Sequence, residues 1–112
     1  MELEICAYSI ESCRNAREAG ANRVELCSSP QEGGTTPSMG MIAAASKLLK
    51  RQTEFQGDKP LELYVMIRPR GGDFVYTDEE FDVMQRDISA IGESGIAVDG
   101  VVFGILTQDG PI

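Results

Sequence analysis

Polar and apolar residues alternate along two short stretches in the first quarter of the chain. Residues 3–9 read LEICAYS and residues 22–28 read NRVELCS. A period of two predicts β-strands, because successive side chains of a strand point to opposite faces. Each stretch places glutamate and cysteine on one face and aliphatic residues on the other: Glu4, Cys6, Glu25 and Cys27 against Leu3, Ile5, Val24 and Leu26.

The segments that follow these strands show helical spacing instead. Residues 10–20 place small apolar side chains one turn apart and predict a short helix. Residues 35–51 carry an amphipathic stripe, and we expect Thr36 to be the N-cap and Pro37 the first helical residue. The polar segment 52–60 predicts a loop.

The second half of the chain repeats the alternation of strand and helix. Residues 61–69, LELYVMIRP, alternate in polarity and end at a proline, which predicts a third strand. Residues 76–95 predict a helix, which Thr77 and Glu80 open with capping-box spacing. The continuous apolar run 99–107, DGVVFGILT, predicts a fourth strand with both faces buried.

Strands that alternate with helices predict a parallel sheet with right-handed crossovers. An open doubly wound sheet would cover both faces with apolar helices, and Glu4 and Glu25 would then be buried without partners. A barrel instead directs one face into a lumen, where polar groups near the strand ends reach solvent or a ligand. The pattern therefore favours the α/β class. We expect these four strands and three helices to be part of a TIM-type (β/α)8 barrel.

Composition narrows the function classes. The chain has 112 residues and a formal net charge of -8, which argues against nucleic acid and anionic membrane surfaces as partners. No apolar run approaches the length of a membrane span. Three cysteines without an export signal indicate reduced thiols and a cytosolic protein, with the nucleus as an alternative compartment.

Four stretches of the chain resemble the N-terminal half of the CutC copper-homeostasis family. They are EIC, GANRVELCSSPQEGGTTPSMG, MIRPRGGDFVYTDEEF and DGVVFGILTQDG, which together cover most of the chain in order. The resemblance implies that residues 1–112 form the N-terminal half of a single eight-stranded α/β barrel domain, with its first four strands and three helices. It also implies a cytosolic protein, oligomeric at full length and linked to copper handling. In eukaryotic relatives the cysteines that correspond to Cys6 and Cys27 have been proposed as Cu(I) ligands. The family's barrel needs about twice this length, since barrels of this type run to ~250 residues.

Cys6 and Cys27 are accordingly the candidate metal ligands. Cu(I) is a soft ion that thiolates select, and neighbouring strands lie ~4.8 Å apart, so inward thiols on adjacent strands are near enough to share one ion. The alternative interpretation is that both cysteines are small core fillers, because cysteine is among the most buried residue types. Cys13 belongs to the first predicted helix, and we expect it in the core.

The two glutamates support a second functional hypothesis, a barrel enzyme. Two carboxylates in one lumen raise the pKa of one of them, so Glu4 or Glu25 would serve as general acid or base. Arg68 ends the third strand on the same face as Tyr64, and its positive charge would neutralise Glu4 and Glu25. The alternative is a structural network of glutamate and arginine that fills the barrel, and whether the protein is an enzyme stays open.

A candidate site for a small anionic ligand follows the third strand, at the end where barrels build their active sites. Arg68 and Arg70 supply positive charge, and Gly71 and Gly72 let backbone N–H groups approach a ligand beside Asp73. The stretch EGGTTPS leads into a helix N-terminus, which also favours an anion. Two glycine-rich turns with no ligand are the plainer interpretation.

A half-barrel leaves its first and fourth strands with unpaired edges. We therefore expect the 112-residue chain either to associate with a second copy, four strands to four, or to behave as a loosely packed fragment, and the pattern favours the fragment.

Overall fold

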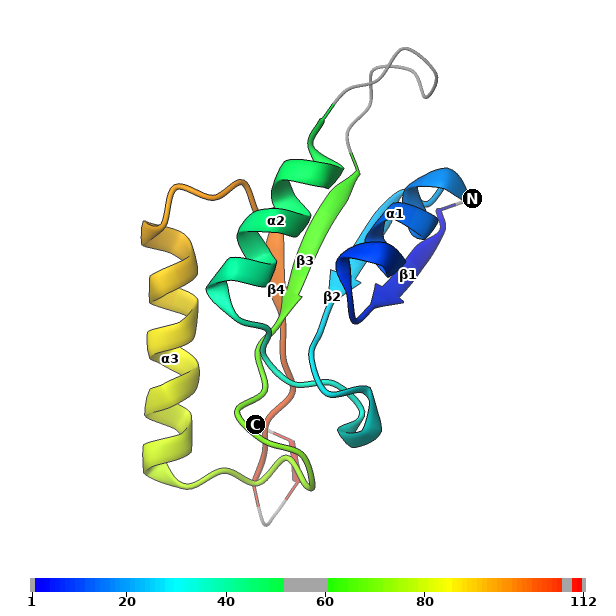
Figure 1. The fold of residues 1–112 in the computed structure, drawn as a ribbon. Coiled ribbons are helices and arrows are strands. Elements are labelled where there is room, and N and C mark those ends of the chain that lie inside the picture. The colour runs from blue at the N-terminus through cyan, green and yellow to red at the C-terminus, as the bar shows by residue number, and fades with distance from the viewer. Residues whose placement is uncertain (1, 52–60, 108–109, 112) are drawn as a thin grey trace.

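The computed structural model describes residues 2–51, 61–107 and 110–111. Its main feature is a four-stranded sheet in the order β1-β2-β3-β4, in which every neighbouring pair is parallel (Figure 1). The strands are β1 (Glu4–Ala7), β2 (Arg23–Leu26), β3 (Glu62–Met66) and β4 (Gly100–Val102). The predicted loop 52–60 lies outside the described residues.

Among the described residues, three α-helices and a single 3-10 turn connect these strands. The helices are α1 (Ile10–Glu18), α2 (Met39–Leu49) and α3 (Asp78–Glu93), and the turn is η1 (Pro30–Glu32). In Figure 1, α1 and α2 lie side by side over the sheet, and α3 stands at the left of the view, on the opposite side of α2 from α1. Strands in chain order with all three helices contributing to one core cluster form a partial TIM-type barrel, as predicted.

The core lies between the helices and one face of the sheet. Val24, Leu63 and Val65 are fully buried there, because alternate residues of paired strands share a face. Removing such a side chain from water stabilises the fold by about 1.5–3 kcal/mol. The helices contribute small and aliphatic residues to the same cluster: Cys13, Ala16, Ile42, Ala45, Leu49, Met84 and Ile91.

The predicted start of the second helix is wrong by two residues. Ser38 is the N-cap of α2, and its side chain accepts a hydrogen bond from the Met41 N–H. Thr36 has a different task, because its Oγ1 accepts a 2.8 Å hydrogen bond from the Arg68 N–H, and its own N–H donates to the Arg68 carbonyl at 3.0 Å. The threonine therefore joins the β2–α2 connection to the end of β3. The predicted capping box of Thr77 and Glu80 is confirmed.

The predicted fourth strand is also longer than the observed one. β4 ends at Val102, whose carbonyl accepts the last ladder hydrogen bond from Ile67. The segment that follows β3 then reaches Pro69, which has no backbone N–H and cannot continue a hydrogen-bond ladder with β4. The chain then forms a small antiparallel pair of β5 (Leu106–Thr107) and β6 (Gly110–Pro111).

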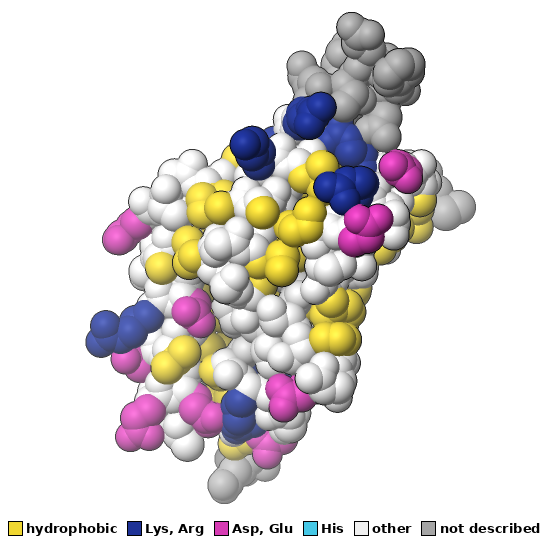
Figure 2. All heavy atoms as spheres, viewed as in Figure 1, with side chains coloured by type: hydrophobic (Ala, Val, Ile, Leu, Met, Phe, Trp, Pro, Cys, Tyr) yellow, Lys and Arg dark blue, Asp and Glu magenta, His cyan; other side chains and the backbone are white. Residues whose placement is uncertain are grey.

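The surface agrees with the acidic composition. Figure 2 shows acidic side chains gathered around α3, and scattered hydrophobic side chains between them. Among the described residues, no helix has the length and apolar character needed to cross a lipid bilayer.

Candidate functional site

The face of the sheet that points away from the helices, called the inner face from here on, carries the predicted chemistry. The strand register aligns Cys6 with Glu25, Glu25 with Tyr64, and Tyr64 with Gly100, so these residues form one row across the sheet. The prediction that glutamates and cysteines share a face opposite the aliphatic residues is confirmed. The inner face comprises Glu4, Cys6, Arg23, Glu25, Cys27, Glu62, Tyr64 and Met66.

The two candidate thiols lie on this face but differ in exposure and position. Cys6 is exposed, whereas Cys27 is 1% exposed. Because Cys6 is level with Glu25, Cys27 lies two residues further along its strand, a backbone diagonal of roughly 8 Å from the usual strand spacing and rise. With metal–thiolate bonds of about 2.3 Å, as for zinc, two ligands of one ion need sulfurs within roughly 4.6 Å.

A loop at the C-terminal end of β2 covers Cys27. We call residues 28–35, which include η1, the covering loop. Gly34 lies directly over the thiol, with φ +103°, and a Cβ at this position would be 3.4 Å from the Cys27 Sγ. Glycine is favoured there by its backbone conformation, whereas a Cβ would make only ordinary van der Waals contact with the thiol.

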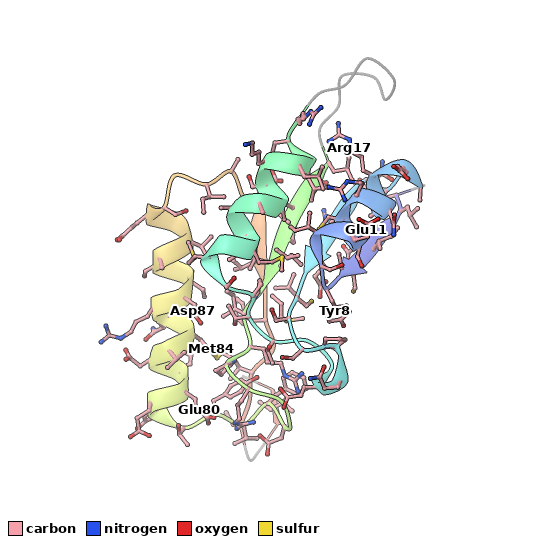
Figure 3. All side chains as sticks on the ribbon, viewed as in Figure 1. Tyr8, Glu11, Arg17, Glu80, Met84 and Asp87 are labelled. Carbon is pink, nitrogen blue, oxygen red and sulfur yellow. The ribbon has the colours of Figure 1, made fainter. Side chains whose placement is uncertain are left out.

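The surroundings keep the thiols protonated. Burial raises the pKa of Cys27 to about 12, and the nearby Glu25 and Cys6 add to this effect. Burial, then Glu25 and Glu4, raise the pKa of Cys6. Tyr8 follows β1 at the same end of the sheet (Figure 3), and burial followed by the charges of Cys27, Cys6 and Glu25 raises its pKa. A metal bound to these sulfurs would have to displace protons.

The predicted pair of glutamates is brought together. Burial raises the pKa of Glu25, and the charge of Glu4 and a hydrogen bond between the two carboxyl groups raise it further. Glu25 also accepts a hydrogen bond from the Cys27 thiol, with 3.9 Å between Oε1 and Sγ. Glu25 is thus a half-buried carboxyl group in contact with both a carboxylate and a thiol.

The cation beside these glutamates is Arg23, and not Arg68 as predicted. Arg23 Nη1 lies 3.4 Å from Glu4 Oε2, Nη2 lies 3.5 Å from Glu62 Oε1, and the guanidinium is 4.2 Å from the centre of the Tyr64 ring. The signal was present in the sequence, because Arg23 has the same strand parity as Glu25. The charged ladder of Glu4, Arg23 and Glu62 follows from that parity.

Arg68 is buried at the end of β3 and donates to backbone carbonyl groups. Its Nη1 donates to the carbonyls of Glu32 at 2.6 Å and Gly34 at 3.0 Å, and its Nη2 donates to Gly72 at 2.7 Å. The guanidinium also lies 4.8 Å from the centre of the Phe74 ring. Arg68 therefore joins the covering loop to the loop that follows β3.

Arg70 belongs to the start of α3. It forms an ion pair with Glu80, donates to the Val75 carbonyl at 2.9 Å, and lies over the Tyr76 ring. Its hydrogen bond with Glu80 is the main reason that the pKa of that carboxyl is lowered. Figure 3 shows Glu80 at this end of α3.

The predicted anion-binding residues do lie together at the C-terminal end of β3. Arg70 Nη1 donates to the carbonyls of Gly71 and Asp73, and Nη2 contacts the Asp73 carboxylate at 3.2 Å. The arginine N–H groups thus contact acceptors of the protein itself, which an anion would have to displace. The anion clamp gains no support from these contacts and stays a prediction.

No preformed metal cluster is present in the part of the chain that the structure describes, since no three histidine, cysteine, aspartate or glutamate side chains are grouped to hold an ion. The candidate ligands are therefore the two thiols, with the neighbouring carboxylates as proton acceptors. Cys13 belongs to α1 and is fully buried in the core, as predicted, and burial raises its pKa to about 11.

Comparison with known proteins gives a consistent result. The family model described as CutC family matches residues 1–112. The chain is 48% identical over 111 residues to a family protein CutC of Vibrio vulnificus (strain CMCP6), covering 99% of this chain and 40% of that protein. It is 47% identical over 110 residues to the copper homeostasis protein cutC homolog of Homo sapiens, covering 98% and 36%.

A solved structure is also similar. The crystal structure of the putative copper homeostasis protein CutC from Streptococcus agalactiae matches with a TM-score of 0.81 and 40% identity, covering 97% of this chain and 48% of that chain. The chain thus spans less than half the length of each of these relatives.

Proposed function

The chain belongs to the CutC family, and from this premise we propose that it serves copper homeostasis in the cytosol by binding Cu(I) through Cys6 and Cys27. The observation that carries the proposal is the placement of these two thiols on one face of adjacent parallel strands. Cu(I) prefers soft sulfur ligands, and no histidine is available in this chain to compete with them.

The neighbouring carboxyl group supports this function. Each thiol must lose its proton before it binds a metal, and the thiol of Cys27 already donates to Glu25. Glu25 is thus the nearest group that could accept the proton as the metal arrives. The stagger between the two cysteines requires their side chains to rotate toward each other.

Anaerobic titration with Cu(I) against a competing chelator tests the proposal. Cys6→Ser and Cys27→Ser should each weaken binding by at least about tenfold, because each removes one of two thiolate ligands. Cys13→Ser is the matched control and should leave the affinity unchanged, since Cys13 lies in the core on the helix side of the sheet. Equal effects of all three substitutions, or none, would sink the paired-thiol site.

The pH dependence of binding sharpens the same test. Below their pKa both thiols are protonated, so the logarithm of the apparent affinity should rise with pH by about two per unit for two released protons. In Cys27→Ser the slope should fall to about one, because one thiol remains to be deprotonated. A slope that is the same in both proteins would place Cys27 outside the site.

A second candidate function is a barrel enzyme that acts on a small anionic metabolite. The observation that favours it is the half-buried Glu25, whose raised pKa suits a general acid or base beside Glu4. Calorimetric titration with small phosphate and carboxylate compounds tests it. The enzyme hypothesis expects a compound whose binding depends on Arg68 and Arg70 but not on Cys6; a uniform lack of binding contradicts it.

A further inference from the structure

We propose that the covering loop acts as a lid over the Cys27 thiol and that the Arg68 guanidinium holds this lid closed. The lid would control access from solvent to one of the two thiols on the inner face. Its consequence for copper rests on the proposed function, but the lid itself is defined by contacts within the chain and is testable without metal.

Cys6 and Cys27 are near neighbours on the same face, yet their exposure is opposite. The difference comes from what lies above each residue. Cys6 is open to solvent, whereas the Gly34 backbone lies so near Cys27 that a Cβ on it would be 3.4 Å from the sulfur and 3.8 Å from Met66 Cε. Removing the covering loop from this position would expose Cys27 beside Glu25. A reagent or metal ion that needs both thiols therefore depends on movement of the loop.

The covering loop is closed by its own hydrogen bonds. Ser28 and Thr35 exchange two backbone hydrogen bonds of 2.9 and 2.8 Å at its base. Within the loop, the Glu32 and Gly34 N–H groups both donate to the Ser29 carbonyl. These bonds do not involve the rest of the molecule, so the loop is able to move as a unit about its base.

Arg68 connects the tip of this loop to the sheet. In the described ranges, the hydrogen bonds that join residues 29–34 to the rest of the molecule come from its Nη1, which donates to the carbonyls of Glu32 and Gly34. The other arm, Nη2, is anchored on Gly72. One buried side chain thus supplies the hydrogen bonds that hold residues 29–34 over Cys27.

The closed position of the covering loop leaves one buried hydrogen-bond donor of Arg68 without a partner among the described residues. Arg68 Nε is buried and has no hydrogen-bond partner among the described residues. An unpaired buried donor is unfavourable, and movement that admits water would relieve it. This orphan donor favours a loop that opens over one that is permanently closed.

Alkylation of the intact, metal-free protein tests the lid, with N-ethylmaleimide as the probe and the rate at each cysteine followed by peptide mass spectrometry. In the wild type Cys6 should react fastest and Cys27 slowly. Arg68→Ala should raise the rate at Cys27 by about tenfold or more, since it removes charge-assisted hydrogen bonds. The rate at Cys13 should not change. Arg86→Ala, at an exposed arginine of α3, is the matched control and should alter neither rate.

Gly71→Ala provides a second variant that keeps the arginine. A Cβ at Gly71 would lie 2.9 Å from the Glu32 Cβ, so the substitution pushes the covering loop away from the loop after β3. It should also raise the rate at Cys27 without affecting Cys13. Gly92→Ala is its control, because a Cβ there has nothing within 4 Å.

Several results would overturn the lid. They are a wild-type Cys27 that reacts as fast as Cys6, a Cys27 rate unchanged in the variants, or rates at Cys27 and Cys13 that rise together through general loosening. If Arg68→Ala does not fold, Gly71→Ala decides by the same criteria. The copper titration is independent of the lid: the effect of Cys6→Ser on Cu(I) binding tests the paired-thiol site whether or not the covering loop moves.

Discussion

The two faces of the four-stranded sheet are built from alternate residues of the same strands, yet they have opposite characters. On the helix side Val24, Leu63 and Val65 have no exposed surface. On the inner face Glu25 and Tyr64, their immediate neighbours in sequence, are partly exposed. The helix side is completed by α1 and α2, while the inner face stays open, because a barrel of this type needs eight strands to close.

The comparison separates stability from chemistry. The helix side contains the aliphatic residues whose burial drives folding, and the inner face contains the thiols, carboxyl groups and the charged ladder at Arg23. Substitutions on the helix side should therefore change the free energy of unfolding most. Substitutions on the inner face should change stability less, and in one case should increase it.

The largest expected effect is that of Leu63→Ala, on the helix side of β3. Leu63 is fully buried in the centre of the sheet, and truncation leaves a cavity that the neighbouring helices cannot fill. The free energy of unfolding, measured by urea denaturation of the intact protein, should fall by about 2–5 kcal/mol.

Leu3→Ala is the matched control for this prediction. The Leu3 side chain is 44% exposed, so the same truncation should cost less than about 1 kcal/mol. If the two leucines contributed equally, the distinction between a closed helix side and open surroundings would be wrong.

Much of this division was predictable from the polarity pattern. Parity along the strands assigned Glu4, Cys6, Glu25 and Cys27 to the inner face, because a period of two leaves no freedom once one face is buried. The same parity also contained Arg23, which the prediction overlooked in favour of Arg68. Local rules of this kind also gave the capping box of Thr77 and Glu80.

The remaining features depend on contacts between distant segments. Thr36 was expected to cap a helix, but it bonds to the backbone of Arg68, which is distant in sequence. Similarly, the sequence around Arg68 suits an anion-binding loop, but in the fold its guanidinium donates to backbone carbonyl groups of two loops. Propensity does not register such long-range hydrogen bonds, and the cover over Cys27 was missed for the same reason.

A smaller effect is expected for Gly100→Ala, which probes a tightly packed point of the inner face. A Cβ at Gly100 would lie 2.7 Å from the Tyr64 ring, and the ring is also stacked against Arg23. The substitution should lower the free energy of unfolding by about 1–3 kcal/mol through overpacking. A neutral result would show that Tyr64 moves freely and that the inner face is open along its whole row.

Gly92→Ala is the control, because it introduces the same methyl group at a position without a steric clash. It lies in α3, where a Cβ meets nothing within 4 Å and alanine is the better helix former. This variant should be more stable than the wild type by up to about 1 kcal/mol. If the two substitutions change the free energy of unfolding in opposite directions, the loss in Gly100→Ala comes from tight packing against the Tyr64 ring.

The smallest predicted change is a gain, in Glu25→Gln. Burial and the nearby Glu4 raise the pKa of Glu25 in the folded protein, so above the ordinary glutamate pKa the folded state binds more protons than the unfolded chain. The stability associated with this proton is complete below the unfolded pKa and is lost as the pH rises through the folded value. Glutamine does not titrate, so the free energy of unfolding of the variant should exceed that of the wild type near neutral pH by about 0.5 kcal/mol, a value kept small by solvent screening.

The gain in Glu25→Gln should disappear at about pH 3.5, where the wild-type carboxyl is protonated in both states. Urea denaturation at both pH values measures the difference, with Glu2→Gln, an exposed residue before β1, as the control that should follow the wild type. A variant less stable than the wild type at neutral pH would mean that Glu25 is favourably paired, and the inner face would then resemble the helix side as a source of stability.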